Sequence, residues 1–286
     1  MNSITIEAPA KINLTLDIKG KRDDGYHELE TVMHQIDLLD YIKIEKTNEN
    51  ISIQSENTQI PNNEENLAYK AAELFFQKNG IKRKGVNIFI QKNIPVGAGL
   101  AGGSTNAAGV LKGLNQLYAV NLDQKSLLKL GEYIGSDVPF CIMGGTALAK
   151  GRGEVLTPIN TQKLTILLVK PKYQLSTAEI YKNFAIDKVE ENPNNGAFLE
   201  AWNNNDIINI TSNIANVLES VSIAKYPEIA NIKNKLKNLG ALNAIMSGSG
   251  PTVFGIFNDR KRALNAHNYF KEQYQEVFLV SSYIKR

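Results

Sequence analysis

Apolar and polar residues alternate in the first stretch of the chain, which predicts strands rather than helices. Ile4 and Ile6 belong to one short run, and the even-numbered positions from Ile12 to Ile18 form a second run. A period of two places every second side chain on the same face of a sheet, so both runs are expected to be half-buried strands. Turn-forming residues at 21–27 then interrupt the pattern. Further strands are predicted at 41–45 and 51–54.

The spacing of apolar residues becomes helical after residue 66. Apolar side chains between 67 and 75 recur at intervals of three and four residues, and Gly80 follows as a helix-ending residue. The charged run 82–84 is typical of a solvated turn. The rest of this half is predicted to hold a strand at 86–90, a glycine-rich loop after Pro95, a helix from about Ser104, and a helix from the capping residue Asp123 to about Ile134.

The second half of the chain mixes strands with helices. An apolar run at 164–169 predicts a buried strand, and the Asn- and Pro-containing stretch 192–205 predicts a loop between helices. The last part is expected to contain a helix at 229–239 stopped by Gly240, a strand at 243–246, a turn at 247–250, a strand at 252–257, a helix from 260 and a strand at 277–283. We therefore expect two mixed domains, residues 1–160 and 161–286.

Composition narrows the class of protein. The formal net charge is +3, from 32 basic and 29 acidic residues, which is too small an excess to indicate a nucleic-acid partner. A single cysteine, Cys141, excludes an intrachain disulfide, and the three histidines form no zinc-type spacing. No apolar run approaches the roughly 20 residues of a membrane helix, and Glu7 and Lys11 occupy the place of a signal-peptide core. A cytoplasmic protein without a membrane partner is expected.

The segment from Pro95 to Ala108 carries the clearest chemical signal. Four glycines within seven residues allow the backbone to approach a ligand closely, and several amides can converge on one anion. The helix that follows directs its free amides and its positive dipole end at the same place. The hydroxyls of Ser104 and Thr105 suit a phosphate oxygen or a Mg²⁺ ion. The loop therefore predicts a di- or triphosphate ligand.

Two other interpretations of this loop fit its glycines less well. Residues 97–102 also fit the dinucleotide pattern GxGxxG, but the acidic residue expected about 20 positions later falls near Asp123, which is typical of a helix cap. A tight turn without a ligand would lose conformational entropy at four glycines with no gain from binding. The sequence has no GxxxxGK[ST] string and no HRD or DFG motif, which excludes P-loop NTPases and protein kinases.

The loop resembles the phosphate-binding motif of the superfamily of galactokinase, homoserine kinase, mevalonate kinase and phosphomevalonate kinase (GHMP kinases). Residues 95–105 match its pattern of a proline followed by Gly-Leu-x-Gly-Ser-Ser, and the turn 247–250 with Thr252 is similar to its third motif. Blocks at 8–14, 24–29 and 135–140 resemble the branch that phosphorylates a cytidine-diphosphate-linked alcohol in the non-mevalonate route to isopentenyl diphosphate. The resemblance covers nearly the whole chain and is weakest at 185–215.

The resemblance implies an α+β fold of two domains, the first like ribosomal protein S5 domain 2 and the second ferredoxin-like. It implies transfer of the γ-phosphoryl group of ATP to the 2-hydroxyl of the cytidyl substrate, with Mg²⁺ as the metal. A monomer or weak homodimer is expected. The alternatives are another alcohol kinase of the superfamily, acting on homoserine or mevalonate, or a sensor that binds nucleotide without turnover.

The resemblance also assigns roles to single residues. Asp137 would orient the substrate hydroxyl or accept its proton, and Lys11 would keep Asp137 ionised and screen the developing charge. Asn66 and Lys92 would flank adenine. ATP binding is assigned to Pro95, Val96, Gly97, Ala98, Gly99, Leu100, Ala101, Gly102, Gly103, Ser104 and Thr105, with the amides from Gly97 on holding the phosphates. Substrate binding is assigned to Asn13, Tyr26, His27, Thr177 and Tyr181, the two tyrosines by stacking on cytosine.

Each assignment has an ordinary structural alternative. Asp137 could be a turn residue at a helix end, because aspartate is common in turns. Lys11 could be a strand lysine that faces water. Tyr181 could be a helical aromatic side chain that packs in the core. Cys141 is expected to be buried packing rather than a reactive thiol.

Overall fold

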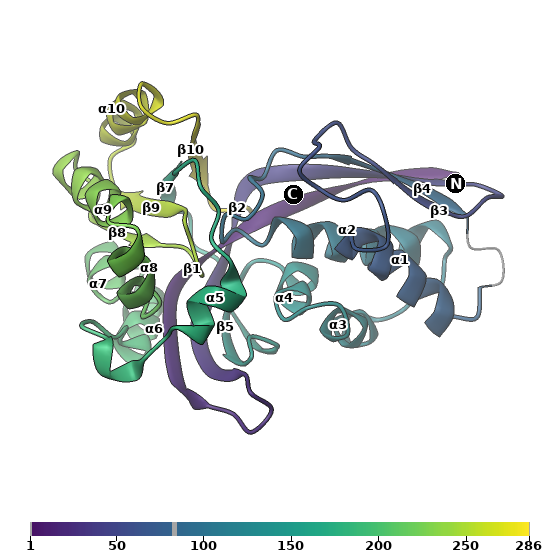
Figure 1. The fold of residues 1–286 in the computed structure, drawn as a ribbon, viewed down its shortest axis with the longest axis horizontal. Coiled ribbons are helices and arrows are strands. Elements are labelled where there is room, and N and C mark those ends of the chain that lie inside the picture. Colours follow the sequence, from purple (N-terminus) through teal and green to yellow (C-terminus); the bar gives the residue numbers. More distant parts are fainter. Residues whose placement is uncertain (1, 82–84, 286) are drawn as a thin grey trace. The chain divides into compact units, whose positions relative to one another are not determined.

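The fold is a computed structural model that describes residues 2–81 and 85–285 (Figure 1). The solvated turn expected at 82–84 lies outside these residues. Contacts divide the chain into two compact units, which are interleaved along the sequence. Unit 1 comprises residues 1–10, 38–96 and 101–144, and unit 2 comprises 11–37, 97–100 and 145–286. These units cross the linear division at residue 160, which stays a prediction.

Two long strands contribute residues to both units. β1 spans Ser3–Lys21 and β2 spans His27–Lys46. The structure corrects two expectations for β1. It is a single strand rather than two, and its second run is not half-buried, because every residue from Ala8 to Ile18 is buried. In that run the alternating pattern reflects polar side chains that find hydrogen-bond partners inside the protein, whereas the run at Ile4 and Ile6 is half-buried as predicted.

Unit 1 packs helices on a small sheet. The second part of β2 pairs antiparallel with β4 (Val86–Gln91), and β4 pairs parallel with β3 (Ile51–Gln54). Gly109 and Gly113 let helix α2 lie against β2, since a Cβ at either position would come within 2.5 Å of Ile42 or Ile44. The helices of this unit are α1 (Leu67–Lys78), α2 (Gly102–Leu117), α3 (Gln124–Glu132) and α4 (Val138–Met143).

Unit 2 contains a four-stranded antiparallel sheet in the order β10-β7-β9-β8. Its strands are β7 (Thr165–Lys170), β8 (Asn243–Met246), β9 (Val253–Phe257) and β10 (Glu276–Ser281), with helices α9 (Glu228–Asn238) and α10 (Arg260–Lys271) packed on it. The sequence of strand, helix, two strands, helix and strand with this order is the ferredoxin-like topology. The predicted second-domain fold is confirmed.

The remaining elements of unit 2 include the first part of β2, two further strands and several short helices. That part pairs with β5 (Thr146–Gly151), and β5 pairs with β6 (Val155–Ile159). The helices are α5 (Thr177–Lys182), α6 (Asn195–Asn203), α7 (Ile207–Ser212) and α8 (Glu219–Lys225), with a 3-10 turn at Ile186–Lys188.

The loop expected at 192–205 is wrong, because α6 occupies most of it. Asn194 caps this helix through its side chain, which accepts a hydrogen bond from the amide of Ala197. Phe198 and Trp202 lie one turn apart, are buried, and stack with ring centres 5.4 Å apart. The helical spacing of two large aromatic residues outweighs the turn preference of the asparagines, which serve as caps.

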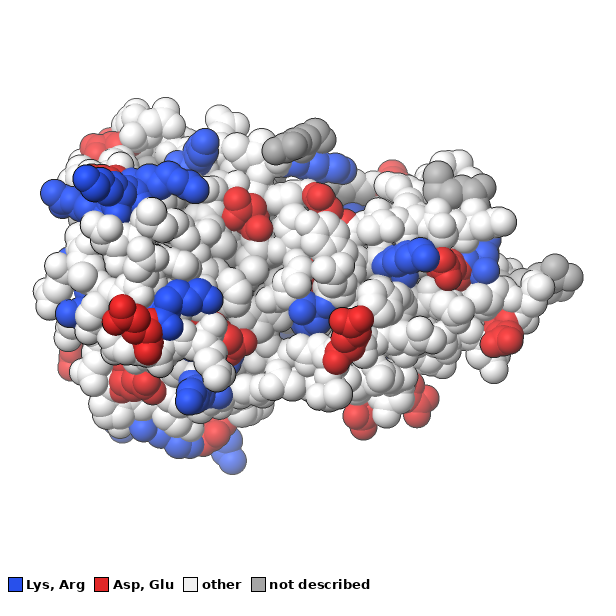
Figure 2. All heavy atoms as spheres, turned by 90° about the horizontal axis from the view of Figure 1, so that it is seen from above, with Lys and Arg blue, Asp and Glu red and all other residues white. Residues whose placement is uncertain are grey.

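The distribution of charged side chains and the apolar character of the helices can be compared with what the composition predicts. Figure 2 shows acidic and basic side chains interspersed over the face that it draws. Within residues 2–81 and 85–285, no helix combines the length and the apolar character needed to span a membrane.

One buried histidine in unit 2 makes the stability of the fold depend on pH. His34 is fully buried, its Nδ1 lies 2.8 Å from the Thr146 hydroxyl, and its Nε2 lies 2.8 Å from the Ser282 hydroxyl. Burial lowers the pKa of His34 to about 3 from an ordinary value of 6.5. The imidazole is therefore neutral in the folded protein at pH 5 to 7.

We expect this histidine to destabilise the fold as the pH falls below 6.5. The unfolded chain then binds a proton that the folded chain excludes, so the free energy of unfolding drops by about 2 kcal/mol between pH 7 and pH 5. In the His34→Gln variant, the glutamine amide supplies a hydrogen-bond donor and an acceptor in place of the imidazole nitrogens but does not titrate. The variant should therefore lose the part of the pH dependence of stability that comes from His34. Urea unfolding of both proteins at pH 7 and pH 5 measures the change in the free energy of unfolding between the two pH values. An equal change in the wild-type protein and the variant would contradict the prediction.

Candidate active site

A chain of buried polar side chains begins at Lys11 on β1. The Lys11 ammonium donates to Asn13 Oδ1 at 2.6 Å, and Asn13 Nδ2 donates to the Thr31 hydroxyl at 2.8 Å. Lys11 is only 4% exposed and Asn13 only 2%. A strand lysine that faces water is thereby excluded. The amide of Asn13 instead holds the ammonium in one direction, as a group acting on a bound substrate requires.

The first part of the glycine-rich loop, residues 97–100, lies against this strand in unit 2. The Lys11 amide donates to the Leu100 carbonyl at 3.2 Å. On its other side, the Ser247 hydroxyl donates to the Gly99 carbonyl at 3.0 Å. The loop and the turn 247–250, which sequence reasoning singled out as separate motifs, are therefore neighbours.

Two glycines make this approach possible. Gly99 has φ +74°, and a Cβ on it would lie 2.2 Å from the Ser247 carbonyl oxygen. Gly248 has φ +56°, and a Cβ there would lie 3.2 Å from Asn13 Oδ1 and 3.7 Å from Lys11 Nζ. At Gly99 both the backbone conformation and the lack of space require glycine, and at Gly248 the left-handed backbone conformation favours it. The turn consequently lies directly beside Lys11 and Asn13.

Asn216 holds the turn in place, although the sequence gave no reason to select it. Its Nδ2 donates to the carbonyls of Met246 at 2.8 Å and Gly248 at 2.7 Å, and its Oδ1 accepts from the Leu218 amide. A single buried asparagine just beyond the weakly matching region 185–215 carries no motif. Thr177, a predicted substrate residue, contacts the same turn through its hydroxyl, 2.8 Å from that of Ser249.

The second part of the loop belongs to unit 1 and opens helix α2. The helix begins at Gly102, two residues before the predicted start, and Ala101 precedes it with φ +55°. The amides of its first turn have no helical acceptor and can bind an anion. Thr105 differs from Ser104, because its hydroxyl donates to Pro9, its amide donates to Ala101, and it is buried. A phosphate contact by Thr105 stays a prediction that would require these bonds to exchange.

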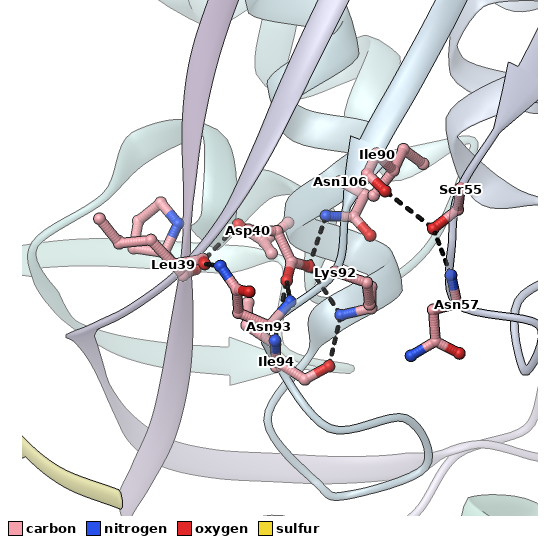
Figure 3. Close-up of polar contacts among 11 residues, drawn as sticks. Leu39, Asp40, Ser55, Asn57, Ile90, Lys92, Asn93, Ile94 and Asn106 are labelled. Atoms are coloured by element: carbon pink, nitrogen blue, oxygen red, sulfur yellow. Dashed lines mark hydrogen bonds and ion pairs between the residues drawn. The ribbon is translucent and has the colours of Figure 1, made fainter.

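The predicted adenine-flanking residues are both engaged within unit 1. Asn66 caps α1, accepting from the Ala68 amide at 2.9 Å, and its Nδ2 donates to the Pro61 carbonyl. Lys92 forms a buried ion pair with Asp40 at 2.6 Å (Figure 3). Burial lowers the pKa of Lys92, and the nearby Asp40 charge partly offsets this effect. Their contact with adenine stays a prediction.

Asp137 is the residue that immediately precedes α4. The sequence places it at a turn, and the structure shows it as the N-cap of this short helix with Pro139 in the first turn. Within the described chain, its carboxylate makes no capping hydrogen bond to α4, although aspartate is a preferred capping residue. Capping therefore does not explain the carboxylate. Asp137 belongs to unit 1 and Lys11 to unit 2, so their pairing stays a prediction.

The predicted cytosine-binding residues partly come together in unit 2. His27 lies 5.5 Å from Tyr181 and 5.9 Å from Phe184, measured between ring centres. Burial, and then the charge of Lys21, lowers the pKa of His27. Tyr26 is 55% exposed, and the Arg152 guanidinium lies 5.1 Å from its ring centre. Sequence reasoning missed Phe184 and Arg152, which no motif marks.

Comparisons with known proteins place the chain in a family. The model described as GHMP kinases N terminal domain matches residues 66–145, and the model GHMP kinases C terminal matches 198–276. The chain belongs to the GHMP kinase family. GHMP kinases use ATP, so the predicted use of ATP is confirmed.

Within this family, the chain is most informatively compared with individual kinases. The chain is 58% identical over 283 residues to the 4-diphosphocytidyl-2-C-methyl-D-erythritol kinase of Syntrophomonas wolfei, covering 99% of both chains. A crystal structure of 4-(cytidine 5'-diphospho)-2C-methyl-D-erythritol kinase matches with TM-score 0.84 and 31% identity, over 98% of this chain and 100% of that one. The crystal structure of homoserine kinase from Cytophaga hutchinsonii matches in fold, with TM-score 0.74 and 19% identity. The match covers 99% of this chain and 95% of that one.

We expect Gly99→Ala to lower kcat/KM by about 10²-fold, because the new Cβ would displace the loop from the Ser247 turn by roughly 1 Å. Gly20→Ala is the matched control, since a Cβ on Gly20 meets nothing within 4 Å and Gly20 lies at the outer end of the same strand as Lys11. Steady-state kinetics and thermal unfolding of both variants check the prediction. An active Gly99→Ala enzyme would show that the close approach is dispensable.

Proposed function

We propose that this chain transfers the γ-phosphoryl group of ATP to the 2-hydroxyl of 4-diphosphocytidyl-2-C-methyl-D-erythritol, giving the 2-phosphate and ADP. This reaction serves the non-mevalonate route to isopentenyl diphosphate. The observation that carries the proposal is the 58% identity over the full length to a kinase of that name. The buried Lys11–Asn13 pair beside the glycine-rich loop and the Ser247 turn supplies the physical support.

The chemistry requires one bond to form and one to break. The oxygen of the substrate hydroxyl attacks the γ-phosphorus, the bond between that phosphorus and the β,γ-bridging oxygen breaks, and the hydroxyl proton leaves. Asp137 either takes this proton or orients the hydroxyl. Lys11, aimed by Asn13, screens the negative charge that develops on the attacking oxygen. Backbone amides of residues 97–104 hold the phosphates.

The aromatic side chains of unit 2 suit the cytidine portion of the substrate. His27, Tyr181 and Phe184 form one cluster, in which an aromatic ring can stack. The low pKa of His27 keeps its imidazole neutral near pH 7, so one ring nitrogen can accept and the other can donate to the pyrimidine edge. The ring of Tyr26 is exposed and so can stack on a base. The Thr177 hydroxyl is within hydrogen-bond distance of the Ser249 hydroxyl.

Mg²⁺ is the metal proposed for this reaction. Among residues 2–81 and 85–285, no group of three or more His, Cys, Asp or Glu side chains is arranged to hold a metal ion. This fits an ion that arrives with ATP, because Mg²⁺ keeps phosphate and water oxygens and needs few protein ligands. The half-buried Ser104 hydroxyl on the first turn of α2 would supply one. The ion neutralises charge on the phosphates when bound.

We further propose that the enzyme is cytoplasmic, acts as a monomer or weak homodimer, and has no nucleic-acid or membrane partner. The single buried cysteine and the small net charge support this assignment.

The test is ADP release with ATP and Mg²⁺ when three alcohols are offered separately. We expect turnover with 4-diphosphocytidyl-2-C-methyl-D-erythritol and none with homoserine or mevalonate. Turnover only with homoserine or mevalonate would preserve the fold and the roles of Lys11 and Asp137 but remove the cytosine site. ATP binding without turnover on any alcohol would identify a nucleotide sensor.

Asp137→Ala should lower kcat by at least about 10²-fold with ATP affinity near normal, because a group positioned for the proton is lost. Asp123→Ala is a matched control, since Asp123 is also an N-cap aspartate of unit 1 but uses its carboxylate to accept from the Ser126 amide at 2.8 Å. Losing that cap lowers the free energy of unfolding and leaves kcat unchanged. Comparable kcat values for both variants would refute the role of Asp137.

A further inference from the structure

Asp40 is a fully buried carboxylate on β2 that no sequence motif marked. Its exposed fraction is 0%. Four donors surround it in Figure 3. Oδ1 accepts from the amides of Asn93 at 2.7 Å and Ile94 at 2.8 Å, and Oδ2 accepts from Lys92 Nζ at 2.6 Å and Asn106 Nδ2 at 2.8 Å. Both oxygens are therefore fully used.

These donors come from the two segments that flank the glycine-rich loop. Residues 92–94 lead directly into Pro95, and Asn106 lies on α2, which begins at Gly102. Lys92 Nζ also donates to the Ile94 carbonyl at 2.7 Å, which tightens the segment before the loop. A Cβ on Gly102 would lie 2.8 Å from the same ammonium. One carboxylate thus joins the chain before the loop to the helix after it.

Stability alone is a weak explanation for this arrangement. Removing a carboxylate and an ammonium from water is costly, and apolar residues of similar size often serve a core equally well. A charged acceptor does what an apolar residue cannot, because it fixes the positions of several donors at once. The donors fixed here belong to the segments that set where the loop leaves β4 and where α2 starts.

We propose that Asp40 is a positioning residue for the nucleotide, holding the two flanks of the glycine-rich loop so that the first-turn amides of α2 stand ready for the ATP phosphates. The inference rests on the proposed function, in which this loop binds ATP. Asp40 itself is buried and acts through Asn93, Ile94 and Asn106. It therefore affects the nucleotide site without touching the nucleotide.

The sharpest test cuts the link to the helix while leaving the Asp40–Lys92 pair intact. Asn106→Ala removes one of the four donors to Asp40. If the lost hydrogen bond must be recovered when the loop is ordered around ATP, its contribution corresponds to about a tenfold loss of ATP affinity. We expect the Kd for ATP and the KM for ATP to rise about tenfold. The KM for the cytidyl substrate should stay within about twofold of the wild-type value.

Asn115→Ala is the matched control on the same helix. Asn115 anchors α2 through two bonds to Leu122, with Nδ2 donating to its carbonyl at 3.0 Å and Oδ1 accepting from its amide at 2.9 Å, away from Asp40. Its loss should lower the unfolding temperature without changing the Kd for ATP. Equal shifts in ATP affinity for the two variants, or none for either, would overturn the role of Asp40.

Two further measurements keep the outcome decisive. If Asn106→Ala does not fold, Asn106→Ser is used, because the shorter hydroxyl cannot replace the amide bond and the same rise in Kd is expected. Calorimetric binding of ATP to the wild-type protein is measured first. A wild-type protein that does not bind ATP would defeat the proposed function, whereas normal ATP binding with an unaffected Asn106 variant would defeat only the inference about Asp40.

Discussion

The close approach of two backbone segments at Gly99 is the constraint on which the candidate site depends. Its carbonyl accepts from the Ser247 hydroxyl, while a side chain on Gly99 would collide with the Ser247 carbonyl. Residues about 150 positions apart in sequence meet there only because both segments turn with positive φ. The Lys11–Asn13 pair borders the same turn at Gly248, so the lysine proposed to act in catalysis lies next to the first part of the glycine-rich loop.

Buried polar side chains fix backbone segments within each unit. Asn13 aims an ammonium, Asn216 fixes the Ser247 turn through two carbonyls, and Asp40 binds both flanks of the glycine-rich loop. In each case one side chain satisfies several backbone or side-chain partners that would otherwise lie unpaired in the interior. Phosphoryl transfer requires positioning and charge stabilisation more than covalent chemistry, and under the proposed function these three residues would supply positioning.

Sequence reasoning identified the fold class and many periodic elements, but it assigned no strand to the first part of β2 or to β5 and β6, and it did not reveal which residues hold the predicted site in place. Strands and helices with strong periodicity were predicted within a few residues, including β8 and α9. It failed at α6, where Asn-rich composition concealed Phe198 and Trp202. It also missed Asp40, Phe184, Arg152 and Asn216, because a single residue that acts through long-range partners leaves no periodic or motif signal.

The two capping aspartates of unit 1 show why residue type alone cannot reveal function. Asp123 and Asp137 both precede a helix, and both fit the ordinary preference for aspartate at that position. Only Asp123 uses its carboxylate for the cap, which lowers its pKa through the bond to Ser126. The local preference therefore accounts for the carboxylate of Asp123 and, at Asp137, only for the position of the residue, so the catalytic role of Asp137 stays a prediction.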